Sequence, residues 1–143
     1  MIKSISLALA VIAFVFAGQV VAQDGRATNP LLGTWELVKS QEAGASDYKD
    51  IPKQHRQLAL YTPTYFTVVG YDTTSKKSDR ALGGRYTVSG EDYAEIIEFP
   101  AIRGKAVTGN TNLFKVRLEG DRFTKIGTLS TGQKLNEVWQ KVK

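Results

Sequence analysis

Residues 111–129 of the chain, TNLFKVRLEGDRFTKIGTL, consist of two β-rich runs on either side of Gly120-Asp121. A two-residue loop that contains glycine is typical of a tight β-hairpin. Residues that pair directly across such a hairpin share a face of the sheet, so we expect Val116 opposite Lys125. The apolar residues on that face predict that it points inward and carries the lysine with it. The face consists of Phe114, Val116, Leu118, Phe123 and Lys125.

The next loop, 130–132, reads Ser-Thr-Gly, and its length decides whether a carboxylate also points inward. A three-residue loop with glycine in the left-handed position pairs Lys125 with Glu137 and places Trp139 on the same face. A two-residue loop would turn Glu137 and Trp139 outward, because a slip of one residue moves every side chain to the other face. We favour the three-residue loop since it buries Trp139. It predicts an interior lysine–glutamate pair beside aromatic rings.

The rest of the chain alternates in the same way between β-rich runs and turn residues, and no apolar run has a clear helical period. Sequential strands joined by hairpin turns predict an all-β fold, a single antiparallel up-and-down β-barrel of about eight strands. A β-sandwich is the alternative. Polar loops are expected over 41–57, 72–80 and 101–110. The expected strands are 33–40, 58–61, 65–71, 81–88, 93–99, 111–119, 122–129 and 133–142.

A second interior carboxylate is expected from the hairpin around residues 89–92. A loop of two or four residues there places Glu95 on the same face as Tyr86. That face consists of Tyr86, Val88, Tyr93, Glu95, Ile97 and Phe99. The strands around Pro63 leave two alternatives open, because both of their faces carry apolar residues. One candidate inner face has Leu58, Leu60 and Val69, and the other has Tyr61, Phe66 and Val68.

The N-terminal segment has the layout of a secretory signal peptide. Lys3 precedes an apolar stretch over 5–17, and Val20 and Ala22 occupy the positions before a cleavage site. A membrane helix needs roughly 20 apolar residues, so this stretch is short for one. We therefore predict export to a bacterial periplasm or to the cell exterior, with no transmembrane segment after cleavage. The predicted parts are a signal peptide at 1–22, a flexible leader at 23–31 and a barrel domain at 32–143.

Composition excludes several classes of site. The chain has no cysteine, which excludes disulfides, cysteine nucleophiles and thiolate metal ligands. The single histidine, His55, lies in a polar and basic stretch and is expected at the surface. The net charge of +5 comes without a basic run interleaved with aromatic residues, so no nucleic-acid site is predicted. No nucleophile motif or phosphate-binding loop is present, and no catalytic residue, metal or cofactor is assigned.

The opening run 32–38, LGTWELV, resembles the Gly-x-Trp strand of lipocalins, and more closely the opening of bacterial lipocalin-like domains of the calycin type. Two positions depart from the family pattern, because Tyr65 stands where glycine is expected and Lys141 where arginine is frequent. The resemblance implies a small β-barrel with a central cavity, usually for an apolar ligand. It also implies that Trp35 and Trp139 help to close one end of the barrel. The resemblance continues in order through LYTP at 60–63, GRYTV at 84–88, VRLEGDRF at 116–123 and EVWQKV at 137–142.

The leading hypothesis is a secreted, non-enzymatic protein that binds a small apolar or amphipathic ligand in the barrel interior. Such pockets are mostly apolar with a few placed polar groups, and Lys125 is a candidate partner for a ligand carboxylate. A structural ion pair without ligand is the alternative, since buried charges require pairing. Two other functions stay open: an envelope module that binds a protein or a surface with a filled barrel, and an acid–base enzyme that uses the interior carboxylates. The candidate ligand-binding residues are Tyr86, Glu95, Phe114, Phe123, Lys125 and Glu137.

Overall fold

The computed structural model describes residues 29–99 and 109–143, and these residues form nine β-strands and no helix. Eight of the strands close an antiparallel β-barrel, because β1 pairs with β9 as well as with β3. The remaining strand, β2, pairs with the last residues of β1. The predicted signal peptide at 1–22 lies outside the described residues. The strands are β1 (Gly33–Gln41), β2 (Lys49–Asp50), β3 (His55–Tyr61), β4 (Tyr65–Asp72), β5 (Ser78–Ser89), β6 (Asp92–Phe99), β7 (Thr111–Glu119), β8 (Arg122–Thr128) and β9 (Lys134–Lys141).

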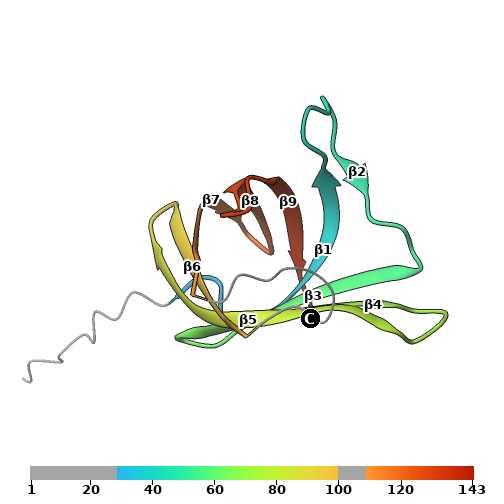
Figure 1. Cartoon of the computed structure of the whole chain (residues 1–143), viewed down its shortest axis with the longest axis horizontal. Helices are drawn as coiled ribbons and strands as arrows, with labels where there is room; N and C mark the ends of the chain where they lie inside the picture. Colours follow the sequence, from blue (N-terminus) through green and yellow to red (C-terminus); the bar gives the residue numbers. More distant parts are fainter. Residues whose placement is uncertain (1–28, 100–108) are drawn as a thin grey trace, which may run out of the picture.

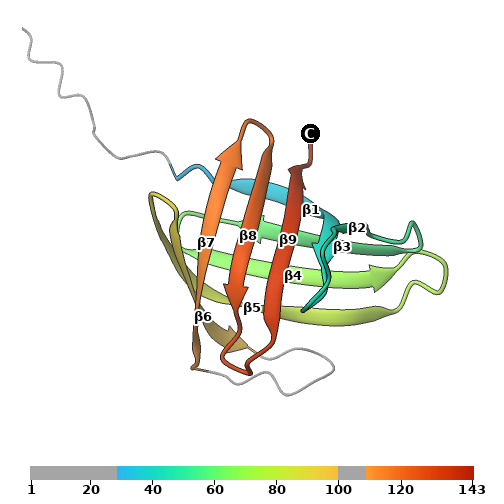
Figure 2. The same cartoon turned by 90° about the horizontal axis from the view of Figure 1, so that it is seen from above.

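The strands follow one another around the barrel in sequence order, as the hairpin turns predict. Figure 1 shows β7, β8, β9 and β1 arching over β3, β4 and β5. Figure 2 shows β7, β8 and β9 crossing β3, β4 and β5 at a steep angle. The barrel therefore has two distinct ends. We call the end at Gly33 and the turn at 62–64 the closed end, and the end at Gln41 and the turn at 129–133 the cleft end.

The register predicted for the three C-terminal strands is confirmed. Val116 pairs with Lys125, and Lys125 pairs in turn with Glu137. Leu118 pairs with Phe123 as expected and lies on the face predicted to point inward, but it is 39% exposed. A single residue pair separates Leu118 from the β7–β8 turn, so its side chain lies at the rim of the barrel, beyond the packed interior.

The β5–β6 hairpin also follows the predicted register near its turn, where Tyr86 pairs with Glu95. The prediction that Phe99 points inward is wrong. Gly84 pairs with Ile97 while Gly83 pairs with Phe99, so β6 carries one extra residue and its alternation is offset. Phe99 is 40% exposed, and its ring lies against Gly83, where any side chain would collide with it.

The ambiguity around Pro63 is resolved in favour of the second alternative, because Tyr61, Phe66 and Val68 are buried. Both expected loops beside these strands are shorter than predicted. β3 already begins at His55, and β5 at Ser78. The start of β5, from Ser78 to Arg80, is exposed, which explains why its composition indicates a loop. The start of β3 is different, because His55 is half-buried and Gln57 is buried despite their polarity.

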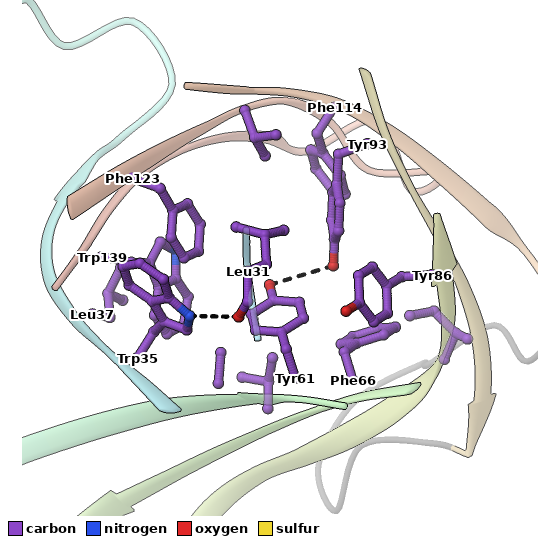
Figure 3. Packing of buried hydrophobic residues seen from close by; sticks show 14 residues of the cluster. Leu31, Trp35, Leu37, Tyr61, Phe66, Tyr86, Tyr93, Phe114, Phe123 and Trp139 are labelled. Carbon is purple, nitrogen blue, oxygen red and sulfur yellow. Dashed lines mark hydrogen bonds between the residues drawn. The ribbon is translucent and has the colours of Figure 1, made fainter. Parts of the chain in front are cut away.

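The core begins before the first strand. Leu31 is 1% exposed, although the sequence places it at the end of a flexible leader. Its carbonyl oxygen accepts a hydrogen bond of 2.8 Å from Trp35 Nε1, and its amide donates to the side chain of Asn29. This residue therefore covers the closed end of the barrel from within, where Figure 3 shows it among the aromatic rings.

Candidate functional site

Three charged side chains meet inside the barrel, each from a different strand. Glu95 of β6 is 4% exposed, Lys125 of β8 is 4% exposed and Glu137 of β9 is 5% exposed. Lys125 Nζ lies 3.1 Å from Glu95 Oε1 and 3.6 Å from Glu137 Oε2. We call these three residues the charged cluster. It contains the lysine–glutamate pair that the loop lengths predict, together with the second carboxylate.

Neighbouring hydroxyl and indole groups also donate hydrogen bonds to the carboxylates. The hydroxyl of Tyr93 donates to Glu95 Oε1 at 3.0 Å, and the indole Nε1 of Trp139 donates to Glu137 Oε2 at 3.0 Å. The hydroxyl oxygens of Tyr61 and Tyr93 lie 3.3 Å apart. Because Tyr93 has one proton and gives it to Glu95, Tyr61 is the donor in that second contact. The result is a short chain of donors that ends on a buried carboxylate.

The charges of the cluster hold its lysine in the protonated form. Desolvation is the largest single influence on Lys125 and by itself lowers its pKa. The charges of Glu95 and Glu137 together outweigh it, so the net effect is to raise the pKa of Lys125. Burial likewise raises the pKa of Tyr61 and of Tyr93, so both keep their protons at neutral pH.

Aromatic rings from several strands point into the barrel and pack together, as Figure 3 shows. The rings of Trp35 and Phe123 meet edge to face with centroids 4.8 Å apart, and Phe123 stacks on Trp139 at 5.9 Å. The ammonium group of Lys125 lies 5.0 Å from the ring centroid of Phe114, within range of a cation–π interaction. Protein side chains thus line the interior in which the sequence predicts a ligand. The buried rings are those of Trp35, Tyr61, Phe66, Tyr86, Tyr93, Phe114, Phe123 and Trp139.

The closed end is sealed by contacts that link the strands to the residues before β1. The hydroxyl of Tyr86 donates to the carbonyl oxygen of Thr62 at 2.6 Å and accepts from the amide of Asn29. Lys141 Nζ lies 5.2 Å from the ring centroid of Trp35. Trp35 is therefore buried at this end of the barrel, with the ammonium group of Lys141 over its ring.

A cleft of about 340 Å³ lies at the cleft end of the barrel. Leu37, Ile51 and Leu135 contribute apolar parts of its lining. Gln57 and Glu137 also line it, although each is only 5% exposed, so they form its floor. The cleft therefore combines apolar walls with two buried polar side chains, and its floor reaches the charged cluster.

The six predicted site residues separate into three groups. Glu95, Lys125 and Glu137 form the charged cluster, Phe114 and Phe123 belong to the aromatic packing, and Tyr86 seals the closed end. Among the residues that the structure describes, Glu137 is the one of these six that lines the cleft.

The sequence reasoning did not predict the cleft, and three of its polar residues show why. His55 is expected at the surface without a site role, and its 31% exposed side chain lines the cleft and lies 3.4 Å from Asp79. Gln57 and Arg80 fall in ranges expected to be loops. The alternation of Gln57 with Ala59 and Tyr61 is a signal that would have extended β3 and turned Gln57 inward.

The described side chains include no group of three or more acidic or histidine residues arranged to hold a metal ion. Nor does any helix in that part of the chain have the length and hydrophobicity to cross a membrane. Comparisons with models of known protein families, with curated proteins and with solved structures found no match to the chain.

Proposed function

We propose that the protein is a non-enzymatic binding protein for a small amphipathic molecule, which it holds in the cleft at the cleft end of the barrel. The observation that carries this proposal is the combination of apolar walls with the buried polar groups of Gln57 and Glu137. Ligand sites are commonly clefts of roughly 300–1,000 Å³ with apolar linings and a few placed polar groups. The volume of about 340 Å³ suits a ligand at the small end of that range.

The cleft is a better candidate than the barrel interior for the position of the ligand. Aromatic rings contact one another across the interior around Phe123, and Lys125 is already surrounded by two carboxylates. A ligand there would compete with these ring contacts and with the ion pairs of Lys125, whereas the cleft offers a volume of about 340 Å³. We therefore assign ligand binding to the residues that line the cleft, including Glu137, and not to the aromatic residues of the interior.

A relationship to the bacterial lipocalin-like domains, with export by a signal peptide at 1–22, remains part of this proposal. The sequential order of eight barrel strands supports it, as does Trp35 buried at the closed end. A position in the periplasm or outside the cell would give such a protein access to small molecules that enter or leave the envelope.

Native mass spectrometry of the protein purified from its own host tests the proposal. We expect a bound mass that is released on unfolding. A Leu135→Trp variant, which fills the cleft, should lose this mass, while Leu113→Trp on the exposed outer face should keep it. Retention by both variants contradicts the cleft as the site. If no mass copurifies and no amphipathic probe binds, the proposed function is wrong.

The second candidate is an interaction module with a filled barrel, which one observation favours. Leu113 is 68% exposed and Ile126 is 46% exposed on the outer face of neighbouring strands β7 and β8. Exposed apolar groups that lie together are a feature of contact surfaces. A Leu113→Glu variant that recovers the same proteins as the unchanged chain in pull-downs from host extract would contradict a partner on this face.

A further inference from the structure

Glu137 is the charged residue that joins the interior to the cleft. Its side chain is 7% exposed, and it still forms part of the cleft floor. Within the part of the chain that the structure describes, it alone belongs both to the charged cluster and to the cleft lining. Whatever occupies the floor of the cleft therefore meets a buried carboxylate.

The charged cluster is unbalanced, because it holds two carboxylates and one ammonium group. Lys125 donates its hydrogen bond to Glu95 at 3.1 Å, and Tyr93 donates to the same oxygen. From Glu137, Lys125 is 3.6 Å away, which is beyond normal hydrogen-bond length. The lysine thus neutralises Glu95 more completely, and the excess negative charge falls on Glu137.

The oxygens of Glu137 differ in their partners. Oε2 accepts the hydrogen bond of Trp139 at 3.0 Å. Among the described residues, every fully buried polar side-chain atom has a hydrogen-bond partner, so Oε1, to which none of these residues donates, is accessible and not enclosed. A carboxylate accepts several hydrogen bonds, so this oxygen can take a donor from a molecule in the cleft.

We propose that the cleft takes amphipathic cations, in particular protonated alkylamines, whose N–H groups bind Glu137. Their hydrocarbon part then lies against Leu37, Ile51 and Leu135. This inference rests on the proposed function, because it requires the cleft to be the ligand site. It replaces the expectation that a ligand carboxylate meets Lys125, since that lysine is enclosed by two carboxylates.

Other charged groups of the lining do not reverse this preference. Glu42, Arg80 and Lys134 are all exposed, so water and salt screen their charges. Glu137 acts from a buried position, where the lower effective dielectric constant strengthens its interaction with a cation. The half-buried His55 has its own carboxylate partner, Asp79, at 3.4 Å.

Three probes of equal chain length isolate the head group: octylamine, octanol and octanoate. Their binding to the folded protein is measured by calorimetry and by tryptophan fluorescence. Trp139 donates a hydrogen bond to Glu137, so its fluorescence should change when a probe binds this carboxylate. We expect octylamine to bind about tenfold or more tightly than octanol, because hydrogen bonds to charged groups are the stronger ones. Octanoate should bind most weakly.

A Glu137→Gln variant tests the role of this carboxylate. Glutamine still accepts a hydrogen bond from Trp139, and the remaining Lys125–Glu95 pair is neutral, so we expect the variant to fold. It should lose the preference for octylamine over octanol. Glu42→Gln, which removes an exposed carboxylate from the same cleft, is the matched control and should keep the preference.

The outcomes separate this inference from the proposed function. Equal binding of the three probes, or a preference for octanoate, overturns the choice of cations and leaves the cleft as a ligand site. Retention of the amine preference in the Glu137→Gln variant also overturns it. If none of the probes binds saturably, the proposed function fails and the inference fails with it. If a variant does not fold, the relative binding of octylamine, octanol and octanoate to the unchanged protein still tests the preference for cations.

Discussion

Replacing Lys125 with methionine removes the single cation of the charged cluster and strands Glu95 and Glu137 in the barrel interior. At an effective dielectric constant of about 20, a charge pair at the 3.1 Å separation of Lys125 and Glu95 is worth about 5 kcal/mol. The desolvation of the ions offsets much of this gain when the cluster is intact. Removing one partner of such a pair typically costs about 3–5 kcal/mol, because uncompensated charge remains buried.

That loss is a large part of the roughly 5–15 kcal/mol that stabilises a typical domain. Urea unfolding followed by circular dichroism measures it as a lower midpoint with an unchanged slope. Lys115→Met is the control, because this lysine on neighbouring strand β7 is 67% exposed and pairs with Asp92 in water; its midpoint should not move.

A second variant distinguishes two causes of the stability loss, namely uncompensated buried carboxylates and the loss of side-chain packing. Combining Lys125→Met with Glu95→Gln and Glu137→Gln leaves no ion in the cluster, and we expect it to recover most of the stability. A Lys125→Met midpoint equal to that of the unchanged protein would refute the reasoning. So would a triple variant as unstable as the single one, since lost packing would then explain the effect.

Three further outcomes follow from the packing and the pKa directions. Gly84→Ala should destabilise the protein by about 1–3 kcal/mol or more, since a Cβ there would lie 1.9 Å from the carbonyl oxygen of Ile96; an unchanged melting temperature would contradict this. Leu31→Ala should cost about 2–5 kcal/mol in thermal unfolding because the side chain is 1% exposed, and a loss near zero would mean that it is not part of the core. Burial raises the pKa of Tyr61 and Tyr93 in the folded state, so above a pH of about 10 only the unfolded chain loses these protons, and the free energy of unfolding should fall. A flat urea midpoint across the alkaline range would count against it.

For the C-terminal strands, loop length and side-chain alternation were sufficient to predict the strand register. The two-residue loop at 120–121 and the three-residue loop at 130–132 each set a register, and the alternation of side chains then turned Lys125 and Glu137 inward. Because short loops leave few choices of pairing, the charged cluster could be predicted from neighbouring hairpins alone. Glu95 joined it by the same logic in the β5–β6 hairpin.

Loop length and side-chain alternation did not predict the bulge in the β5–β6 hairpin or the position of the cleft. The offset at Gly83 and Gly84 depends on how closely β5 approaches β6, where a Cβ on Gly84 would overlap the backbone of Ile96. The cleft joins residues such as Leu37, Gln57 and Glu137 from strands far apart in sequence. Their meeting depends on how the barrel closes through β1 and β9, which no single hairpin determines.

The charge of the buried cluster links ligand binding in the cleft to the stability of the barrel. Lys125 is buried beside the rings of Phe114 and Trp139 and is held between the two carboxylates. A neutral lysine–glutamate pair would suffice to satisfy that lysine. The second carboxylate, Glu137, adds a buried charge that destabilises the fold unless a cation offsets it. Because this same carboxylate lines the cleft, a bound cation would relieve the imbalance, and ligand binding would then stabilise the barrel through its interior.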